Sequence, residues 1–321
     1  MTALSLHYLQ VDDYSTWDAF VDISLQRTIF GKSWYLKALA VKFELLVVKN
    51  GERIVGGIVL TKTSGAYRNP YLCKYLGVYF ADFQGSDYQK VSKQHQVLAV
   101  LMPALKKLPS FDYFFHPSFN SYLPFHADQF DNRVRYTFWM DFEKSNFDQI
   151  QQRFHGKLRS ELKFAERQNY AIDWTIDFST FYQVIRRRLD QKNAYFPFSK
   201  KALTHFYDTL TARNALQLVG VKNAQLEVMA VAGLLQTKQT TTLLFNGMDT
   251  TKMQRGANEW LIYHCLQRAA NQSQCFDFEG SMLPEVASFY RKFGGEMRPY
   301  LQVYRPSFRA EMKRMFKRLF Y

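Results

Sequence analysis

Cysteine, acidic residues and long apolar runs are all scarce in this chain of 321 residues. The three cysteines, Cys73, Cys265 and Cys275, are too few and too scattered for a disulfide framework. No Cys-x-x-Cys or His-Glu-x-x-His spacing predicts a zinc site. No apolar run reaches the length of about 18 residues that predicts a membrane span, and aspartates occupy the place of a signal-peptide core. These absences predict a protein of the reducing cytoplasm without a metal, a signal peptide or a membrane span.

The charge that is present is mostly positive. Lys and Arg number 42 against 28 Asp and Glu, a formal net charge of +14. With 47% hydrophobic and 22% charged residues, the composition is that of a globular chain, and its length allows about two domains. The charge favours an anionic partner, and it leaves nucleic acid, an anionic membrane surface and a nucleotide cofactor all open.

An internal repeat organises the sequence. Two apolar runs around a polar turn, which predict a hairpin, occur at 43–62 and again at 216–238, with Val-Lys-Asn and later Gly, Thr and Lys in common. Similar Ser/Thr-capped helix starts precede them at 13–17 and 177–181, and similar strands follow at 111–115 and 276–279. Matched segments in the same order predict a duplicated domain.

We therefore predict an α+β protein with two similar domains, 1–142 and 143–304, each a mixed, mostly antiparallel sheet flanked by helices. A basic amphipathic helix is predicted over 305–321. In the second domain the patterns predict helices at 148–168, 178–192, 199–213, 256–271 and 284–293, a hairpin at 216–237, and strands at 240–248, 275–280 and 297–305.

The segment 240–270 carries the clearest chemical signal. A β-branched strand ends in a polar loop, and Arg255-Gly256-Ala257-Asn258 then opens a helix. Small residues at such a junction let backbone N–H groups approach a phosphate, the helix dipole favours its charge, and Arg255 supplies a cation. The segment therefore predicts an anion site, although the same residues are also typical of a helix that packs close to a sheet.

The next segment adds two carboxylates. On the strand predicted at 275–280, Asp277 and Glu279 would share one face and Phe276 and Phe278 the other. Pro284 then starts a helix that the Gly294-Gly295 pair ends.

Taken together, Arg255 to Asn258 at a helix start and Phe289-Tyr290-Arg-Lys-Phe-Gly-Gly295 after the next strand resemble the cofactor half of the GNAT N-acyltransferase fold. The tandem arrangement is similar to the FemAB-like branch of that superfamily, and the basic segment 155–167 is similar to a helix of that branch. The resemblance implies an acyltransferase that uses acyl-CoA, such as acetyl-CoA, without a metal. It implies a cofactor site made by the pyrophosphate loop and the strand before it, namely by Phe245, Asn246, Gly247, Met248, Arg255, Gly256, Ala257 and Asn258.

The resemblance implies one catalytic residue, and the chemistry of acyl transfer suggests two more. Tyr290 matches the tyrosine that lies near the thioester sulfur, and a phenol with a pKa near 10 can protonate a departing thiolate. Glu279 is the candidate base that accepts the amine proton, with Asp277 behind it. The first copy has Asp87 where the second has Arg-Gly-Ala, so we expect it not to bind CoA and instead to wall an acceptor cleft between the domains.

Three functions stay open at this point. The first is N-acyl transfer from acyl-CoA to a small-molecule or peptidyl amine bound between the domains. The second is FemAB-like transfer of an amino acid from aminoacyl-tRNA to a cell-wall precursor, which the net charge of +14 suits. The third is a non-catalytic basic module that binds RNA or an anionic membrane, the latter through the helix at 305–321, which would place the protein at the inner membrane face.

Overall fold

The computed structural model describes residues 3–305, and within them the chain forms two compact units. The first unit comprises residues 3–135 together with 299–305, and the second comprises Tyr136–Arg298. The helix predicted over 305–321, with its membrane contact, lies outside the described residues. The described part contains no helix that is both long and apolar enough to cross a membrane.

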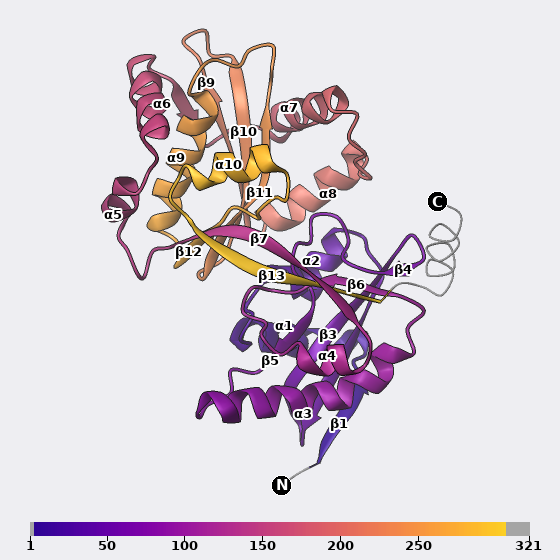
Figure 1. Ribbon diagram of the computed structural model, residues 1–321. Helices are drawn as coiled ribbons and strands as arrows, with labels where there is room; N and C mark the ends of the chain where they lie inside the picture. The colour runs from indigo at the N-terminus through magenta and orange to yellow at the C-terminus, as the bar shows by residue number, and fades with distance from the viewer. Residues whose placement is uncertain (1–2, 306–321) are drawn as a thin grey trace, which may run out of the picture. The chain divides into compact units, whose positions relative to one another are not determined.

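The first unit is built on an antiparallel sheet in the order β1-β2-β3-β4, with β5 also paired to β3 (Figure 1). A second antiparallel pair joins β6 to the end of β13. The strands are β1 (Leu4–Tyr8), β2 (Phe43–Asn50), β3 (Arg53–Thr63), β4 (Ala66–Tyr67), β5 (Val78–Phe80), β6 (Phe111–Phe114) and β13 (Glu296–Arg305). The helices are α1 (Tyr14–Ile23), α2 (Ser33–Ala38), α3 (Asp87–Lys106) and α4 (Leu123–Ala127), with short 3-10 turns at Val11–Asp13 and Ile29–Gly31.

The second unit contains one mixed sheet in the order β7-β12-β11-β10-β9-β8. Its strands are β7 (Asp131–Asp141, of which Tyr136–Asp141 belong to this unit), β8 (Ala171–Asp173), β9 (Leu216–Lys222), β10 (Val228–Gln236), β11 (Thr240–Met248) and β12 (Cys275–Asp277). The first three residues of β13, 296–298, also belong to this unit. Its helices are α5 (Phe147–Gln152), α6 (Gly156–Arg167), α7 (Phe178–Gln191), α8 (Lys200–Thr211), α9 (Ala257–Ala270) and α10 (Pro284–Arg291). In Figure 1, α6, α9 and α10 cover one face of this sheet and α7 and α8 the other.

The α+β class and both predicted hairpins are confirmed. In the first hairpin Asn50 pairs with Arg53 across a two-residue turn that contains Gly51 at φ +59°. In the second, Asn223 closes a longer turn by accepting hydrogen bonds from the backbone N–H groups of Gln225 and Glu227.

Two local predictions were wrong. The helix predicted at 148–168 is divided into α5 and α6, because His155 starts a new helix by accepting a hydrogen bond from the N–H of Lys157 at 3.2 Å. At the repeated helix starts the cap is not Ser or Thr: Asp177 caps α7 through the N–H of Thr180, and Asp13 precedes α1 without a side-chain cap.

The core of the second unit lies between the sheet and α9. Leu261, Cys265 and Ala269 form the predicted apolar face of α9 and are fully buried. They pack against β9 and β10, whose residues are almost all buried. This packing fixes the start of α9 relative to the end of β11, where the sequence predicts an anion site.

Candidate functional site

The strands β11 and β12 form a fork in the sheet of the second unit. They run parallel and pair only from Thr240 with Cys275 to Thr242 with Asp277. β11 continues to Met248, whereas the chain after Asp277 follows β7: the N–H of Phe278 donates to the carbonyl of Phe138 at 3.1 Å. The two strands therefore separate beyond Thr242 and leave one edge of β11 unpaired by β12.

A β-bulge lies at the mouth of this fork. Leu243 pairs with Leu234 of β10, and Phe245 pairs with Gly233, so that Leu244 is an extra residue in β11. The extra residue of a bulge is left out of the hydrogen-bond ladder, and the strand bends there. The backbone of β11 thus changes direction just where it loses β12 as its neighbour.

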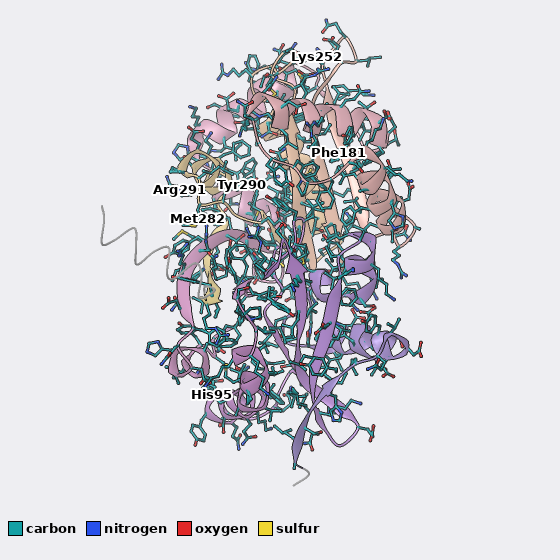
Figure 2. The ribbon with its side chains drawn as sticks, turned by 90° about the vertical axis from the view of Figure 1, so that its right-hand side faces the viewer. His95, Phe181, Lys252, Met282, Tyr290 and Arg291 are labelled. Atoms are coloured by element: carbon teal, nitrogen blue, oxygen red, sulfur yellow. The ribbon has the colours of Figure 1, made fainter. Side chains whose placement is uncertain are left out.

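The side chains of β11 beyond the bulge are used for packing. Phe245 contacts Phe181 of α7, which Figure 2 labels, with 5.6 Å between the ring centroids. A Cβ at Gly247 would lie 2.6 Å from the side chain of Ile185, so glycine allows α7 to approach closely. Met248 packs against the core on the side of α9. Phe245 and Met248 therefore contribute to packing, although both stay partly exposed, and Gly247 has no side chain to offer a ligand.

A pair of amides ties β11 to the start of α9. The side chains of Asn246 and Asn258 donate hydrogen bonds to one another at 2.9 and 3.3 Å. Asn258 is almost fully buried, as is Ala257 beside it. Both asparagines were predicted to bind a cofactor, and the structure places their side chains in contact with each other.

The start of α9 has no side-chain cap, because its N-cap residue is Gly256. Gly256 has a left-handed backbone with φ +76°, and a Cβ there would lie 2.8 Å from the carbonyl oxygen of Glu161 on α6. Both the backbone angle and the contact require glycine. α6 therefore closes one side of the helix start, and no side chain occupies the acceptor position that a Ser or Asp would fill.

Arg255 lies beside this helix start and has two contacts with α6. Its Nε donates to a carboxylate oxygen of Glu161 at 2.9 Å, and its guanidinium lies 4.8 Å from the centre of the Phe164 ring. The hydrogen bond to Glu161 raises the pKa of Arg255. The side chain is still 58% exposed. Glu161 was not predicted from the sequence, because no local pattern links residues 94 positions apart.

Tyr290 on α10 is buried against the aromatic core. Its ring centroid lies 4.8 Å from that of Phe278, and Phe293 belongs to the same cluster. Within residues 3–305 its hydroxyl forms no hydrogen bond to another side chain or to the backbone. Burial first, and then the charges of Glu279 and Asp277, raise the pKa of Tyr290 well above its ordinary value, so the phenol keeps its proton at neutral pH. Figure 2 shows Tyr290 with Met282 and Arg291 on one flank of the unit.

The two predicted carboxylates are close in sequence but differ in environment. Asp277 is 1% exposed and accepts hydrogen bonds from the hydroxyl of Thr137 at 2.5 Å and from the N–H of Glu279 at 2.8 Å. Glu279 and Gly280 both have left-handed backbones, with φ +60° and +58°. The predicted shared strand face is therefore wrong, because β12 ends at Asp277 and Glu279 lies in a turn beyond it.

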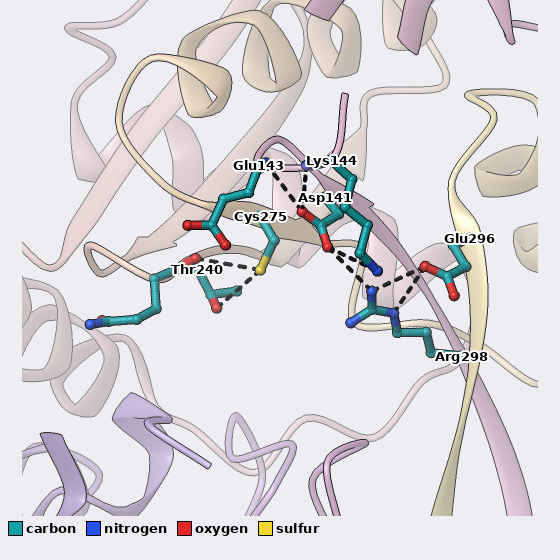
Figure 3. Close-up of polar contacts among 8 residues, drawn as sticks. Asp141, Glu143, Lys144, Thr240, Cys275, Glu296 and Arg298 are labelled. Atoms are coloured by element: carbon teal, nitrogen blue, oxygen red, sulfur yellow. Dashed lines mark hydrogen bonds and ion pairs between the residues drawn. The ribbon is translucent and has the colours of Figure 1, made fainter. Parts of the chain in front are cut away.

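Polar contacts also hold the base of the fork (Figure 3). Arg298 lies 3.6 Å from the carboxylate of Asp141 and 3.0 Å from that of Glu296. Cys275 lies 3.3 Å from the hydroxyl of Thr240. Burial raises the pKa of the Cys275 thiol to about 11. Cys275 is therefore a protonated structural residue at neutral pH and not a thiolate nucleophile.

The loop between β11 and α9 is anchored by ion pairs. Asp249, almost fully buried at the end of β11, pairs with Arg187 of α7. Lys252, labelled in Figure 2, lies 3.2 Å from Glu227 at the end of the β9–β10 turn. Within residues 3–305 no group of three or more His, Cys, Asp and Glu side chains is arranged to hold a metal ion.

Comparison with protein families identifies a known domain in the second unit. The family profile described as "Acetyltransferase (GNAT) domain" matches residues 152–284, which contain the fork, the bulge and α9. None of the curated protein sequences matches this chain.

Solved structures share the fold over nearly the whole chain. A crystal structure of FemX has a TM-score of 0.67 at 12% identity and covers 92% of this chain and 96% of its own. L-PGS from Bacillus licheniformis has a TM-score of 0.56 at 13% identity, over 94% of this chain and 95% of its own. A tandem GNAT protein from the clavulanic acid biosynthesis pathway has a TM-score of 0.54 at 11% identity, over 94% and 97%. At these identities the likeness is one of fold.

Proposed function

We propose, from the premise that this chain carries a GNAT domain and has a tandem GNAT, FemAB-like fold, that it is an N-acyltransferase. It would transfer an acyl group from acyl-CoA to an amine, and the donor would bind in the second unit. The observation that carries the proposal is the fork between β11 and β12, with its bulge at Leu244, next to an uncapped helix start and Arg255.

In this proposal the residues at the fork would hold a CoA molecule. The exposed guanidinium of Arg255 and the first turn of α9 would hold the diphosphate, because both attract negative charge. The unpaired edge of β11 would hold the pantetheine arm through its backbone. When bound, acyl-CoA supplies a thioester carbonyl and a thiolate leaving group.

The chain's own groups would then move the protons. The Tyr290 phenol, protonated at neutral pH, would donate its proton to the departing thiolate. Glu279 would accept a proton from the attacking amine, directly or through water. Backbone N–H groups of β11 at the bulge would stabilise the negative charge that develops on the carbonyl oxygen.

In this scheme Asp277 positions Glu279 instead of acting as a base. Its carboxylate is buried and already accepts two hydrogen bonds, one of them from the N–H of Glu279. It thereby fixes the left-handed turn that carries the Glu279 side chain.

A second candidate donor is aminoacyl-tRNA, as the FemAB-like resemblance implies. The surroundings of Arg255 favour it. The Nε of Arg255 already donates a hydrogen bond to Glu161, and α6 covers part of the start of α9, where the diphosphate of CoA would have to bind. A carboxylate at this place opposes a diphosphate and is compatible with a donor that binds elsewhere through its phosphates.

Thermal unfolding with and without CoA, acetyl-CoA and a long-chain acyl-CoA separates the two donors. A ligand at about 100 times its Kd stabilises the folded state by about 2.7 kcal/mol, which raises Tm by a few degrees. We expect Arg255→Glu to abolish the shift and Glu161→Gln to increase it, because Glu161 competes for the guanidinium. Arg186→Glu, which breaks the ion pair of Arg186 with Asp190 on α7, is the matched control and should leave the shift unchanged.

Absence of a shift with every CoA species, in a protein that unfolds cooperatively, would overturn the acyl-CoA proposal. Binding of aminoacyl-tRNA that weakens steeply with salt would then support the second candidate.

A further inference from the structure

The first unit contains a cavity of about 490 Å³ between the start of β3, the segment after β5, and α3. α3 approaches β3 closely at Gly56, where a Cβ would lie 2.5 Å from the side chain of Val97. The preceding residue, Val55, is the extra residue of a bulge opposite β2. Ala81, whose N–H donates to the carbonyl of Val55 at 3.0 Å, has too small a side chain to fill the space next to it. The bulge and the alanine together leave the cavity open.

The floor and one wall of the cavity are apolar. Val55, Ala81 and Val97 are almost fully buried in the absence of a ligand, and each still contributes to the lining. Phe83, in the segment that follows β5, is half-buried and forms one wall of the cavity. The volume lies within the range of about 300–1,000 Å³ that is typical of small-molecule sites. A flat apolar group that binds here would therefore be removed from water, which favours its binding.

The rim of the cavity carries excess positive charge. Arg53 and Lys93 are exposed, and neither forms an ion pair with a carboxylate of residues 3–305. Lys93 is held in place because its Nζ donates to the carbonyl of Gln84 at 3.2 Å and lies 5.8 Å from the centre of the Phe83 ring. The carboxylate of the lining, Asp82, is 3.3 Å from Arg27, which balances its charge.

We propose that this cavity binds a small organic anion with a flat apolar body, of the aromatic carboxylate class. The ring system lies on Val55 and Ala81 beside Phe83, and the acid group is bound by Arg53 and Lys93. Hydrogen bonds from a cation to a carboxylate are stronger than those between neutral groups, and both side chains have N–H groups that can still donate. The site is independent of the proposed transferase reaction, because none of its residues belongs to the second unit.

Calorimetric titration of the full chain with 1-naphthoate and with the neutral 1-naphthalenemethanol tests both parts of the proposal. The two probes share the ring system and differ in charge. We expect 1-naphthoate to bind about tenfold more tightly, as expected for charge-assisted hydrogen bonds at a partly exposed rim. The double variant Arg53→Gln/Lys93→Gln should make the two affinities equal. Phe83→Ala should weaken both probes.

The matched control is Lys42→Gln/Lys107→Gln, which removes two exposed charges of the same unit outside the cavity. It should keep the tenfold preference, and all variants should unfold at a Tm close to that of the parent chain. The proposal is overturned if 1-naphthoate does not bind, or if its preference survives in the Arg53→Gln/Lys93→Gln variant. The second result would place the anion site elsewhere in the molecule.

Discussion

Two helices that occupy the same place in the two units begin in opposite ways. α3 and α9 each follow a strand paired to the preceding hairpin, and each leads into the next strand, β6 or β12. Ser86 caps α3 by accepting from the N–H of Gln89, and the Gln89 side chain accepts from the N–H of Ser86 in return. α9 begins at Gly256 without any side-chain cap and with Arg255 beside it.

The two helix starts differ in whether their first backbone N–H groups remain available to a ligand. A capping box satisfies the first N–H groups of a helix within the chain, and Asp87 in the first turn of α3 adds a charge that repels anions. Gly256 offers no acceptor to the first turn of α9, so that an external anion can take that role. The helix start of the first unit is therefore satisfied within the chain, whereas that of the second unit has no side-chain cap and is the donor site in the proposed function.

The largest expected effect is on catalysis, through Tyr290→Phe. If the second unit performs the transfer, loss of the phenol proton should lower kcat about a hundredfold, in the lower part of the range for general acid catalysis. The Kd for acyl-CoA should not change, because the ring that packs on Phe278 is kept. Because the pKa of Tyr290 is raised, ionisation of this phenol should cause no loss of kcat between about pH 8 and 10.

Tyr122→Phe is the matched change in the first unit. Tyr122 precedes α4, the counterpart of α10 in order along the chain, and its hydroxyl donates to the carbonyl of Phe130 at 2.5 Å. This variant should lose about 1 kcal/mol of stability and retain its transfer rate. Equal losses of kcat in the two variants would contradict the division between the units.

The local elements around this site could be predicted from the sequence. The β-branched run of β11 and the Gly-Ala start of α9 predict their bounds to within a residue, because both are set by side chains adjacent along the chain. The order of strands and helices in the second unit was predicted from their local patterns, and both predicted hairpins are present, one in each unit.

The contacts between candidate site residues and residues far away in the sequence could not be predicted. Glu161 meets Arg255 across 94 residues, and Thr137 meets Asp277 across 140, and no spacing in a single sequence records such pairs. The turn at Glu279 was missed for a related reason. Its left-handed backbone follows from the bond between its N–H and Asp277 and from the close fit of Gly280 against β7, whereas the alternating side chains are typical of a longer strand.

An intermediate effect is expected at the edge strand of the second unit in acid. Asp173 on β8 is 2.7 Å from Lys222 of β9, and hydrogen bonds from Lys222 and Thr175 lower its pKa from 3.8 to about 2. A carboxylate with a lowered pKa stabilises the folded state above its unfolded pKa and loses that contribution as the pH falls toward 2. About 2 kcal/mol should be lost in this window. The edge strand β1 of the first unit, Leu4–Tyr8, has no acidic residue and should not respond.

Hydrogen exchange of the amides in β8 and β1, compared at pH 5 and pH 2.5, measures this difference strand by strand. Asp173→Asn should remove most of the acid sensitivity of β8. Asp190→Asn, which removes a surface carboxylate paired with Arg186, should leave it unchanged. Equal acid sensitivity of β1 and β8 in the parent chain would count against an origin in the Asp173–Lys222 pair.

The smallest effect, and the most direct test of the capping argument, is expected at Ser86. Ser86→Ala removes the acceptor for the N–H of Gln89 and should cost about 1 kcal/mol of stability, measured by urea unfolding, whereas Ser86→Gly should cost only a few tenths of a kcal/mol. Neither variant should create a site for CoA in the first unit, because Asp87 remains in the first turn and no arginine stands next to it. A CoA-induced rise in Tm that survives Arg255→Glu in the Ser86→Gly background would show that capping alone separates the two helix starts. If Arg255→Glu abolishes the CoA-induced rise in Tm in this background as well, the difference between the two helix starts depends on charge as well as on the cap.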